Sequence, residues 1–217
     1  MFIRTAVNIT VLSLLLAFWA PLAYGTQPQE GYIVIEPSAK TLSYMIGDKP
    51  YKSYPVAVGE SDTPTPVGEW QIEYMARHWG DGFGTRWMGL NVPWGLYGIH
   101  GTNKPWSIGT CASHGCVRMF NQDAEELYKL VKVGTRVIVK GQIFSPFYEE
   151  RRVLHEGIRG SDVMLLQKKL IEQGYLHGEY DGFFGHNTEK ALKKFQKDYS
   201  FEVTGQVDAD IYAAIGL

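Results

Sequence analysis

The sequence has few cysteines, almost no excess charge and only one strongly apolar stretch. Two cysteines among 217 residues are too few for a disulfide scaffold, because small stapled domains use four or more. The 21 basic and 23 acidic side chains leave a formal charge of −2. No global positive field is therefore present to attract phosphates, and we expect no nucleic-acid partner. An apolar content of 45% excludes a disordered or collagen-like chain.

The first 25 residues are organised like an export signal. The segment begins with a positively charged region at Arg4, and an apolar core follows from Val11 to Ala20. The small residues that a signal peptidase needs are present in Ala23-Tyr24-Gly25. The apolar core is about half the roughly 20 residues of a spanning helix. An uncleaved anchor is the alternative, because residues 5–29 carry no charge. We expect residues 1–25 to be a signal peptide, and the mature protein to be exported with no stable membrane partner.

The length allows two small domains, and the first is predicted to be mainly β. Residues 31–140 contain short β-type runs separated by glycine and proline, which favours a sandwich-like or barrel-like domain with antiparallel strands. One helix is predicted at residues 123–131, from the spacing of Leu127, Leu130 and Val131. The predicted strands are residues 32–36, 41–46, 51–58, 67–74 and 135–140.

After a linker at residues 141–153, the apolar period becomes helical. Residues 154–217 are predicted to form a small all-α domain of three helices, capped by Ser161, Asn187 and Asp208. Two glycine-containing turns, residues 180–185 and 203–207, each precede a helix and form a weak internal repeat. The predicted core of this domain is Val163, Leu166, Leu170, Leu192, Phe195, Val203 and Ile211.

Reactive side chains are densest between residues 97 and 119. A cysteine nucleophile needs a nearby histidine or cation, because only a few per cent of a free thiol is ionised at neutral pH. His100 and His114 are both candidates to activate Cys116. Gly115 favours a tight turn before Cys116 and lets backbone N–H groups approach a developing oxyanion. Arg118 is suited to hold a substrate carboxylate through two hydrogen bonds.

Over roughly residues 31–140 the sequence resembles the L,D-transpeptidases with a YkuD-type catalytic domain. The order of the His100 motif and the Cys116 motif is highly specific. The motifs that carry the resemblance are Thr63-Pro64-Thr65-Pro66-Val67-Gly68, Ile99-His100-Gly101-Thr102, Gly109 and Ser113-His114-Gly115-Cys116-Val117-Arg118-Met119.

The resemblance implies a role for each motif residue. Cys116 is expected to be the nucleophile and His100 its general base, with the Gly101 carbonyl orienting the imidazole. The orienting and oxyanion residues would be Gly115 with the Cys116 N–H, together with Ser113 and His114. Arg118 and Thr102 are expected to bind substrate. No cofactor and no metal are implied.

The family reaction cleaves a peptidoglycan stem peptide between its third residue and a terminal D-Ala. A thioester forms on the cysteine, D-Ala leaves, and an acceptor amine then gives a 3→3 cross-link. Attack by water instead gives L,D-carboxypeptidase activity. The resemblance therefore makes peptidoglycan the expected partner.

Residues 160–215 resemble the three-helix peptidoglycan-binding module. The matching stretches are Gly160 to Leu176, Asp181 to Tyr199 and Thr204 to Ile215, with Asp210 where a threonine is common. Tethering to the wall would raise the local substrate concentration. If the first domain is catalytically inactive, the alternative is a non-catalytic protein that binds the cell wall.

Two chemical alternatives concern the same cysteine. A zinc site formed by His100, Cys111, His114 and Cys116 lacks a recognisable ligand spacing. A disulfide between Cys111 and Cys116 would switch the nucleophile off under oxidation. The tryptophans near the motif suit either a substrate-covering loop or, more often, core packing; they are Trp79, Trp87, Trp94 and Trp106.

Overall fold

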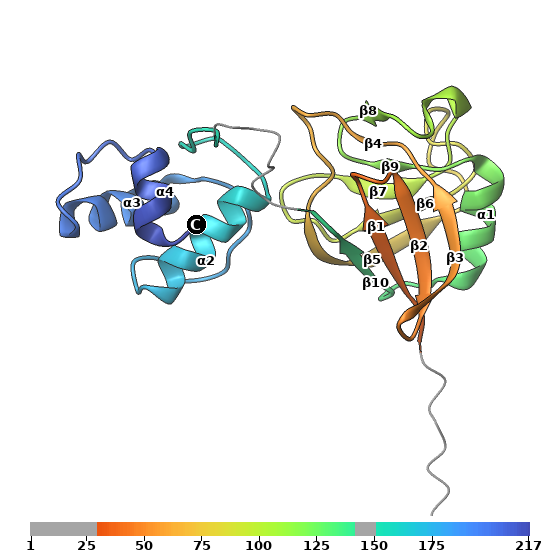
Figure 1. The fold of residues 1–217 in the computed structure, drawn as a ribbon, viewed down its shortest axis with the longest axis horizontal. Coiled ribbons are helices and arrows are strands. Elements are labelled where there is room, and N and C mark those ends of the chain that lie inside the picture. Colours follow the sequence, from red (N-terminus) through yellow and green to blue (C-terminus); the bar gives the residue numbers. More distant parts are fainter. Residues whose placement is uncertain (1–29, 142–150) are drawn as a thin grey trace, which may run out of the picture.

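The computed structural model describes residues 30–141 and 151–217. The predicted signal peptide and most of the predicted linker lie outside these residues. The described residues form two hydrophobic cores, one drawn from residues 33–139 and the other from residues 154–215. Figure 1 shows the corresponding β domain and helical domain side by side.

The β domain is built on one curled, mixed sheet of eight strands in the order β3-β2-β1-β10-β5-β6-β7-β9. Two of its pairs are parallel, β1 with β10 and β7 with β9. A separate parallel pair joins β4 to β8. The strands are β1 (Tyr32–Glu36), β2 (Thr41–Ile46), β3 (Lys49–Pro55), β4 (Val58–Gly59), β5 (Gly68–Ala76), β6 (Trp87–Leu90), β7 (Tyr97–His100), β8 (Cys111–Ser113), β9 (Val117–Arg118) and β10 (Arg136–Val139).

One α-helix, α1 (Asn121–Leu130), packs against this sheet, and a short 3-10 turn, η1 (Pro105–Ser107), lies between β7 and β8. Ala124 and Leu127 of α1 are fully buried in the β-domain core. The predicted mainly β domain with one packed helix is confirmed. Only β1, β2, β3, β5 and β10 were predicted, however, and the predicted strand at residues 51–58 is divided between β3 and β4.

The helical domain contains α2 (Ser161–Glu172), α3 (His186–Asp198) and α4 (Ala209–Ile215), as predicted. Asp208 caps α4 by accepting a hydrogen bond from the Ile211 N–H at 3.0 Å. The other two predicted caps are wrong: α2 starts after Gly160 and α3 after Gly185, both without a side-chain cap. The Ser161 hydroxyl instead donates to the Val67 carbonyl of the β domain at 2.9 Å. This longer-range contact takes the hydroxyl that would have capped the helix.

Six of the seven predicted core residues of the helical domain are buried. Val203 is the exception, because it is 49% exposed, and Val207 is fully buried in its place. Val207 pairs with Leu154 through two backbone hydrogen bonds of 3.2 and 2.9 Å. This short pairing turns Val207 inward and closes the domain with the segment that enters it.

The weak internal repeat in the sequence has a structural basis in two buried glutamines. Gln167 of α2 accepts the Gly182 N–H at 2.8 Å and donates to the Phe183 carbonyl at 3.0 Å. Gln196 of α3 accepts the Gly205 N–H at 2.9 Å and donates to the Gln206 carbonyl at 3.0 Å. Both glycines have positive φ, 69° and 74°, which glycine adopts without steric cost. Each helix therefore holds the turn that leads into the next one.

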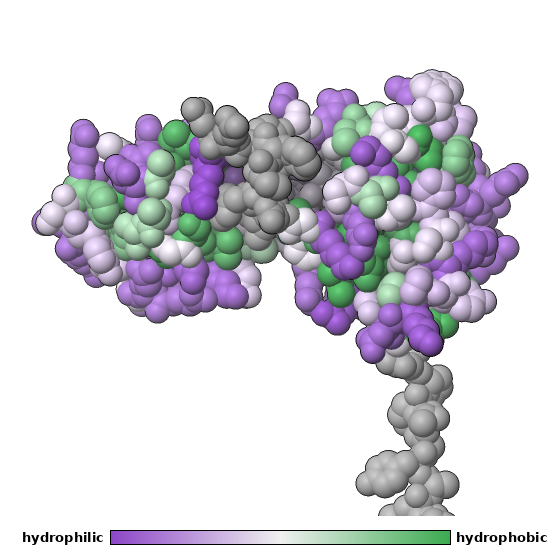
Figure 2. Space-filling view, viewed as in Figure 1, coloured by the Kyte–Doolittle hydropathy of each residue, from purple (hydrophilic) through white to green (hydrophobic). Residues whose placement is uncertain are grey.

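The surface in Figure 2 mixes hydrophilic residues with small apolar patches on both domains. None of the helices within residues 30–141 and 151–217 is long and apolar enough to cross a bilayer.

We predict that Gln167→Leu lowers the free energy of unfolding of the helical domain by about 3 kcal/mol, because it leaves the buried Gly182 N–H without an acceptor. Gln173→Leu is the matched control: its Nε2 donates weakly to the Ile215 carbonyl at 3.4 Å from an exposed position, so its effect stays within about 0.5 kcal/mol. Urea unfolding followed by far-ultraviolet circular dichroism measures both. Equal effects of the two substitutions would show that the hydrogen bonds of Gln167 to the Gly182 turn are not stabilising.

Candidate active site

The parallel pairing of β7 with β9 brings the His100 and Cys116 motifs together. Ile99 lies opposite Val117, and His100 lies opposite Arg118. Residues that lie opposite each other in a parallel pair project to the same face, so Arg118 shares a face with His100. Cys116 is the turn residue directly before β9. A Cβ at Gly98 would lie 2.6 Å from Cζ2 of Trp87, so glycine there leaves room for the indole that stacks on His100. The pairing thus brings a thiol, an imidazole and a guanidinium to neighbouring positions at the end of β7 and the start of β9.

The turn that carries Cys116 is held by Ser113. The Ser113 hydroxyl donates to the Cys116 carbonyl at 2.5 Å, and it accepts the Gly115 N–H at 3.2 Å. Gly115 has φ +104°, and a Cβ there would lie 2.6 Å from Cε1 of Tyr97. Only glycine satisfies both conditions. The sequence-based prediction of a tight turn at Gly115, rather than a strand, is confirmed because β8 ends at Ser113 and β9 begins at Val117.

The threonine-proline motif packs against this turn. The Ser113 carbonyl accepts from the Glu60 N–H at 2.9 Å and from the Thr63 hydroxyl at 3.3 Å. Thr65, 4% exposed, accepts the Gly59 N–H at 2.9 Å through its hydroxyl. A segment that lies about fifty residues earlier in the chain therefore supports the back of the Cys116 turn.

His100 is 2% exposed and enclosed by aromatic rings. Its ring stacks on Trp87 at a centroid distance of 5.4 Å and meets the edge of Phe83 at 5.0 Å. Nδ1 lies 2.5 Å from the Gly101 carbonyl. A carbonyl only accepts, so Nδ1 carries the proton and Nε2 keeps its lone pair. Burial lowers the pKa of His100 to about 4; the Gly101 carbonyl opposes this shift, and the Arg118 charge adds to it.

Cys116 is a partly buried, free thiol. Burial raises its pKa, although a backbone hydrogen bond with Gly98 and the positive charge of Arg118 act in the opposite direction. Its Sγ approaches the Leu96 carbonyl at 4.0 Å. A raised thiol pKa beside a lowered imidazole pKa favours the neutral pair over a thiolate and imidazolium. His100 is then an unprotonated base throughout the neutral pH range.

The remaining predicted site residues lie in different environments. Arg118 of β9 is close enough to both His100 and Cys116 to influence their pKa values. Thr102 is 3% exposed, and its hydroxyl accepts the Lys104 N–H at 3.0 Å. Thr102 therefore organises its own loop, and its predicted contact with substrate stays a prediction. His114 is exposed at the outside of the turn.

Several supporting residues were not found from the sequence. The side-chain oxygen of Asn121, at the start of α1, accepts N–H groups from Thr102 at 3.0 Å and Thr85 at 3.2 Å. It thereby links the loop after His100 to the segment that carries Phe83. Tyr97 supports Gly115. These contacts join segments that are distant in the sequence, and no local pattern indicates them.

The four tryptophans near the motif separate into two pairs. Trp87 and Trp94 are core residues, at 0% and 7% exposure, whereas Trp79 and Trp106 are 41% and 76% exposed. Trp79 stacks on Trp87 at 5.4 Å. Core packing therefore explains two of them, and the exposed pair keeps open the alternative of a substrate-covering surface.

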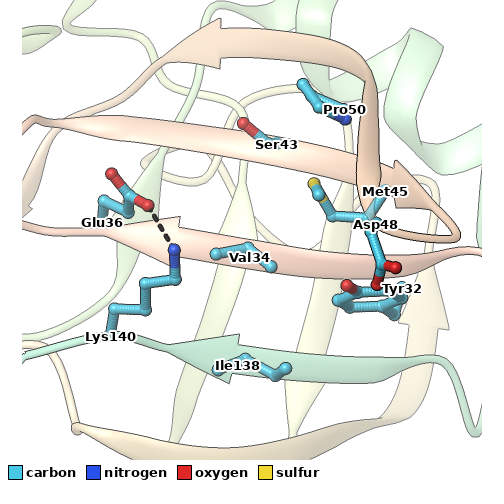
Figure 3. Close-up of a pocket in the computed structure, with 9 residues that line it drawn as sticks. All are labelled: Tyr32, Val34, Glu36, Ser43, Met45, Asp48, Pro50, Ile138 and Lys140. Atoms are coloured by element: carbon cyan, nitrogen blue, oxygen red, sulfur yellow. Dashed lines mark hydrogen bonds and ion pairs between the residues drawn. The ribbon is translucent and has the colours of Figure 1, made fainter.

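A hollow of about 420 Å³ lies on the outer face of β1, β2 and β10, lined by Tyr32, Met45 and the Glu36–Lys140 ion pair among others (Figure 3). Neither Cys116 nor His100 lines it. This hollow is therefore separate from the side chains with catalytic chemistry.

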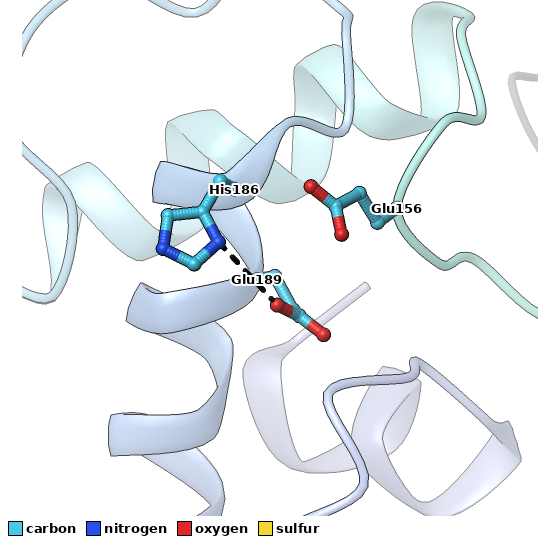
Figure 4. A group of neighbouring side chains, drawn as sticks. All are labelled: Glu156, His186 and Glu189. Carbon is cyan, nitrogen blue, oxygen red and sulfur yellow. Dashed lines mark ion pairs between the residues drawn. The ribbon is translucent and has the colours of Figure 1, made fainter.

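One group of metal-type ligands occurs in the described part of the chain, in the helical domain. The ligand atoms of Glu156, His186 and Glu189 lie within 4.8 Å of one another (Figure 4). The ammonium group of Lys193 already pairs with Glu189 at 2.9 Å, so one of the two carboxylates has a positively charged partner. The four residues of the alternative zinc site do not form such a group in the described part, and Cys111 and Cys116 are both free thiols.

Comparison with known proteins agrees with this geometry. The model of the L,D-transpeptidase catalytic domain (YkuD) matches residues 30–139, just over half of the chain. A second model, "Putative peptidoglycan binding domain", matches residues 159–215. The chain belongs to the L,D-transpeptidase family, and its helical domain matches the peptidoglycan-binding module.

Individual relatives cover the same region. "Putative L,D-transpeptidase YkuD" of Bacillus subtilis is 44% identical over 108 residues, which are 50% of this chain and 65% of that protein. "Putative L,D-transpeptidase YqjB" of Bacillus subtilis is 30% identical over 64% of this chain and 86% of its own length. A solved L,D-transpeptidase from Mycobacterium smegmatis aligns with a TM-score of 0.44 and 22% identity, covering 52% of this chain and 59% of that one.

We predict that alkylation of Cys116 by iodoacetamide becomes about tenfold faster per pH unit from pH 7 to 8.5 without a plateau, because a raised thiol pKa keeps the thiolate a minor species in this range. Mass spectrometry of a Cys111→Ser protein isolates the reaction at Cys116. A plateau that begins below pH 7 would instead indicate a resting thiolate–imidazolium pair.

Proposed function

We propose that this protein is a cysteine-dependent L,D-transpeptidase that acts on peptidoglycan stem peptides. The observation that carries the proposal is the pairing of β7 with β9, which sets His100 opposite Arg118 and leaves the Cys116 turn at the start of β9. The Nδ1 of His100 faces the Gly101 carbonyl, which leaves Nε2 as the free base. Family membership supports the reaction class. The chain covers 65% of the length of the YkuD relative, and the substrate and reaction steps are therefore proposed from the residues of this chain.

The first step is acylation of Cys116. The sulfur attacks the carbonyl carbon of the third stem residue while Nε2 of His100 takes the thiol proton, and a C–S bond forms. The C–N bond to the terminal D-Ala then breaks, and the imidazolium returns its proton to the leaving amine. A thioester remains on Cys116. Because both groups start neutral, deprotonation accompanies attack instead of preceding it.

The second step transfers the acyl group. An amine from a neighbouring stem attacks the thioester carbonyl, and His100 again accepts the proton that the nucleophile loses. The C–S bond breaks, the thiol is restored, and a 3→3 cross-link results. Water in place of the amine gives the carboxypeptidase outcome. Thioesters favour aminolysis, which supports transfer as the main reaction.

Two further groups complete the proposed site. The Gly115 N–H already donates to Ser113 within the turn, so the Cys116 N–H is the stronger oxyanion donor of the two predicted ones. Arg118, whose charge acts on the Cys116 thiol, is suited to pair with a stem carboxylate. Ser113 acts through the turn that it holds.

The helical domain is proposed to bind the wall polymer. A hollow of about 310 Å³ in this domain is lined by His177, Glu179, Phe183 and Asn187 among others. Phe183 is 37% exposed, whereas the adjacent Phe184 is fully buried. An exposed ring beside amide and carboxylate groups suits glycan and peptide contacts. Phe184 belongs to the core and has no such role. Both domains thus favour a protein that is exported to the cell wall or periplasm.

We predict that incubation with disaccharide-tetrapeptide yields 3→3 dimers and a transient Cys116 adduct by mass spectrometry. Cys116→Ala and His100→Gln should lower turnover at least about 1,000-fold, because the nucleophile and its base act as one unit. Cys111→Ser is the matched control and should leave turnover unchanged, since Cys111 is exposed on β8.

Other products identify the alternatives. Tripeptide alone would make the protein an L,D-carboxypeptidase. Neither product nor adduct, with binding to intact sacculi retained, would contradict the enzymatic proposal and favour a wall-binding protein.

A further inference from the structure

The helical domain contacts the β domain at the loop between β6 and β7, residues 91–96. Trp94 of this loop is 7% exposed and meets the Trp70 ring edge to face at 5.3 Å. Another part of the indole faces Gly182 of the helical domain. A Cβ on Gly182 would lie 2.3 Å from Cε3 of Trp94 and 2.7 Å from Cζ3. The absence of a side chain at Gly182 is therefore a condition for this approach.

Three further contacts connect the same two surfaces. The Ser161 hydroxyl donates to the Val67 carbonyl at 2.9 Å. Met164 of α2 packs against the hydrophobic core of the β domain. Burial raises the pKa of Tyr97, and the positive charge of Arg159 is one of the groups that oppose this rise. Residues from the turn before α2, from α2 itself and from the turn at Gly182 thus meet one region of the β domain.

The contacted loop leads directly to the nucleophile. The Leu96 carbonyl accepts from Cys116 Sγ at 4.0 Å. The Tyr97 ring lies against Gly115, where a Cβ would come within 2.6 Å of it. A continuous series of contacts therefore runs from Gly182 through Trp94 to the residues that border Cys116.

We propose that the helical domain is a positioning element of the active site, and that its contact with Trp94 fixes the loop wall beside Cys116. This inference rests on the proposed catalytic role of Cys116. It also gives the wall-binding surface a set orientation relative to the nucleophile, whereas a module joined only through its linker would supply proximity alone.

The internal repeat of the helical domain supplies a matched pair of variants. Gly182→Ala and Gly205→Ala each place a Cβ on a turn glycine of positive φ whose N–H is held by a buried glutamine. The methyl group added at position 182 meets Trp94 of the β domain. The methyl group added at position 205 meets the flexible side chains of Lys193 and Glu189 within its own domain. The backbone strain is matched, and only the first variant disturbs the contact between domains.

The experiment uses full-length protein carrying Cys111→Ser, below the unfolding midpoint of every variant. We expect Gly182→Ala to speed iodoacetamide alkylation of Cys116 about fivefold, because a displaced loop exposes the thiol. We expect it to lower kcat/KM on soluble disaccharide-tetrapeptide about tenfold, mainly through kcat. Gly205→Ala should stay within about twofold of the parent in both measurements. In a Trp94→Leu background, which lacks Cε3 and Cζ3, the two glycine-to-alanine variants should become equivalent.

Equal alkylation and turnover for the two glycine variants would overturn the inference, as would a difference that persists with Trp94→Leu. If Gly182→Ala does not fold, the double variant Arg159→Gln with Ser161→Ala replaces it: faster alkylation supports the inference and an unchanged rate overturns it. A parent protein without turnover would contradict the proposed function, while the alkylation rates would still decide the role of the contact.

Discussion

The site depends on a parallel pairing between two very short strands, β7 and β9. Parallel neighbours need a crossover connection, and here the connection contains the Ser113 to Cys116 turn itself. The short strand β9 is held on both sides: Arg118 exchanges backbone hydrogen bonds of 2.9 Å with Ala57, and the N–H of Met119, directly after β9, donates to the His100 carbonyl at 2.8 Å. Displacement of β9 by one residue would turn Arg118 to the opposite face from His100 and would move the Cys116 turn with it.

Burial gives this site a particular electrostatic character. The aromatic enclosure of His100 and the desolvation of Cys116 shift their pKa values in opposite directions, away from an ion pair. The cost is a small thiolate fraction at rest. The benefit is a base that stays unprotonated and a thiol that reacts only when the carbonyl of a bound substrate is in place for attack. This low resting reactivity limits unproductive alkylation and oxidation of the thiol. In the proposed mechanism, the reactivity of Cys116 therefore depends on substrate.

The sequence predicted those parts of the structure that local rules determine. Five strands, four helices and the Asp208 cap follow from periodicity and capping chemistry within a few residues. Strands β6 to β9 span only two to four residues, too few for a period. The equally short β10 was found because it lies in a run of β-branched residues, whereas β6 is buried at every position and shows no alternation.

Long-range contacts account for the other differences. Ser161 does not cap α2 because Val67, 94 residues away, accepts from its hydroxyl. The motif residues could be found from their resemblance to a family, whereas Asn121, Tyr97 and Gly182 act only through contacts that the fold creates. The role of the Thr102 hydroxyl in its own loop, where it accepts the Lys104 N–H, also follows from the fold rather than from the motif.

The protonation state of His100 tests the account most directly. Nitrogen-15 NMR of the imidazole at pH 7 should show a proton on Nδ1 and a lone pair on Nε2, with conversion to imidazolium only near pH 4, since burial lowers the pKa of His100 to about 4. A Cys116→Ala protein should show the same tautomer, because the Gly101 carbonyl rather than the thiol selects it. An imidazolium at pH 7, or a proton on Nε2, would contradict the neutral, oriented base on which the mechanism rests.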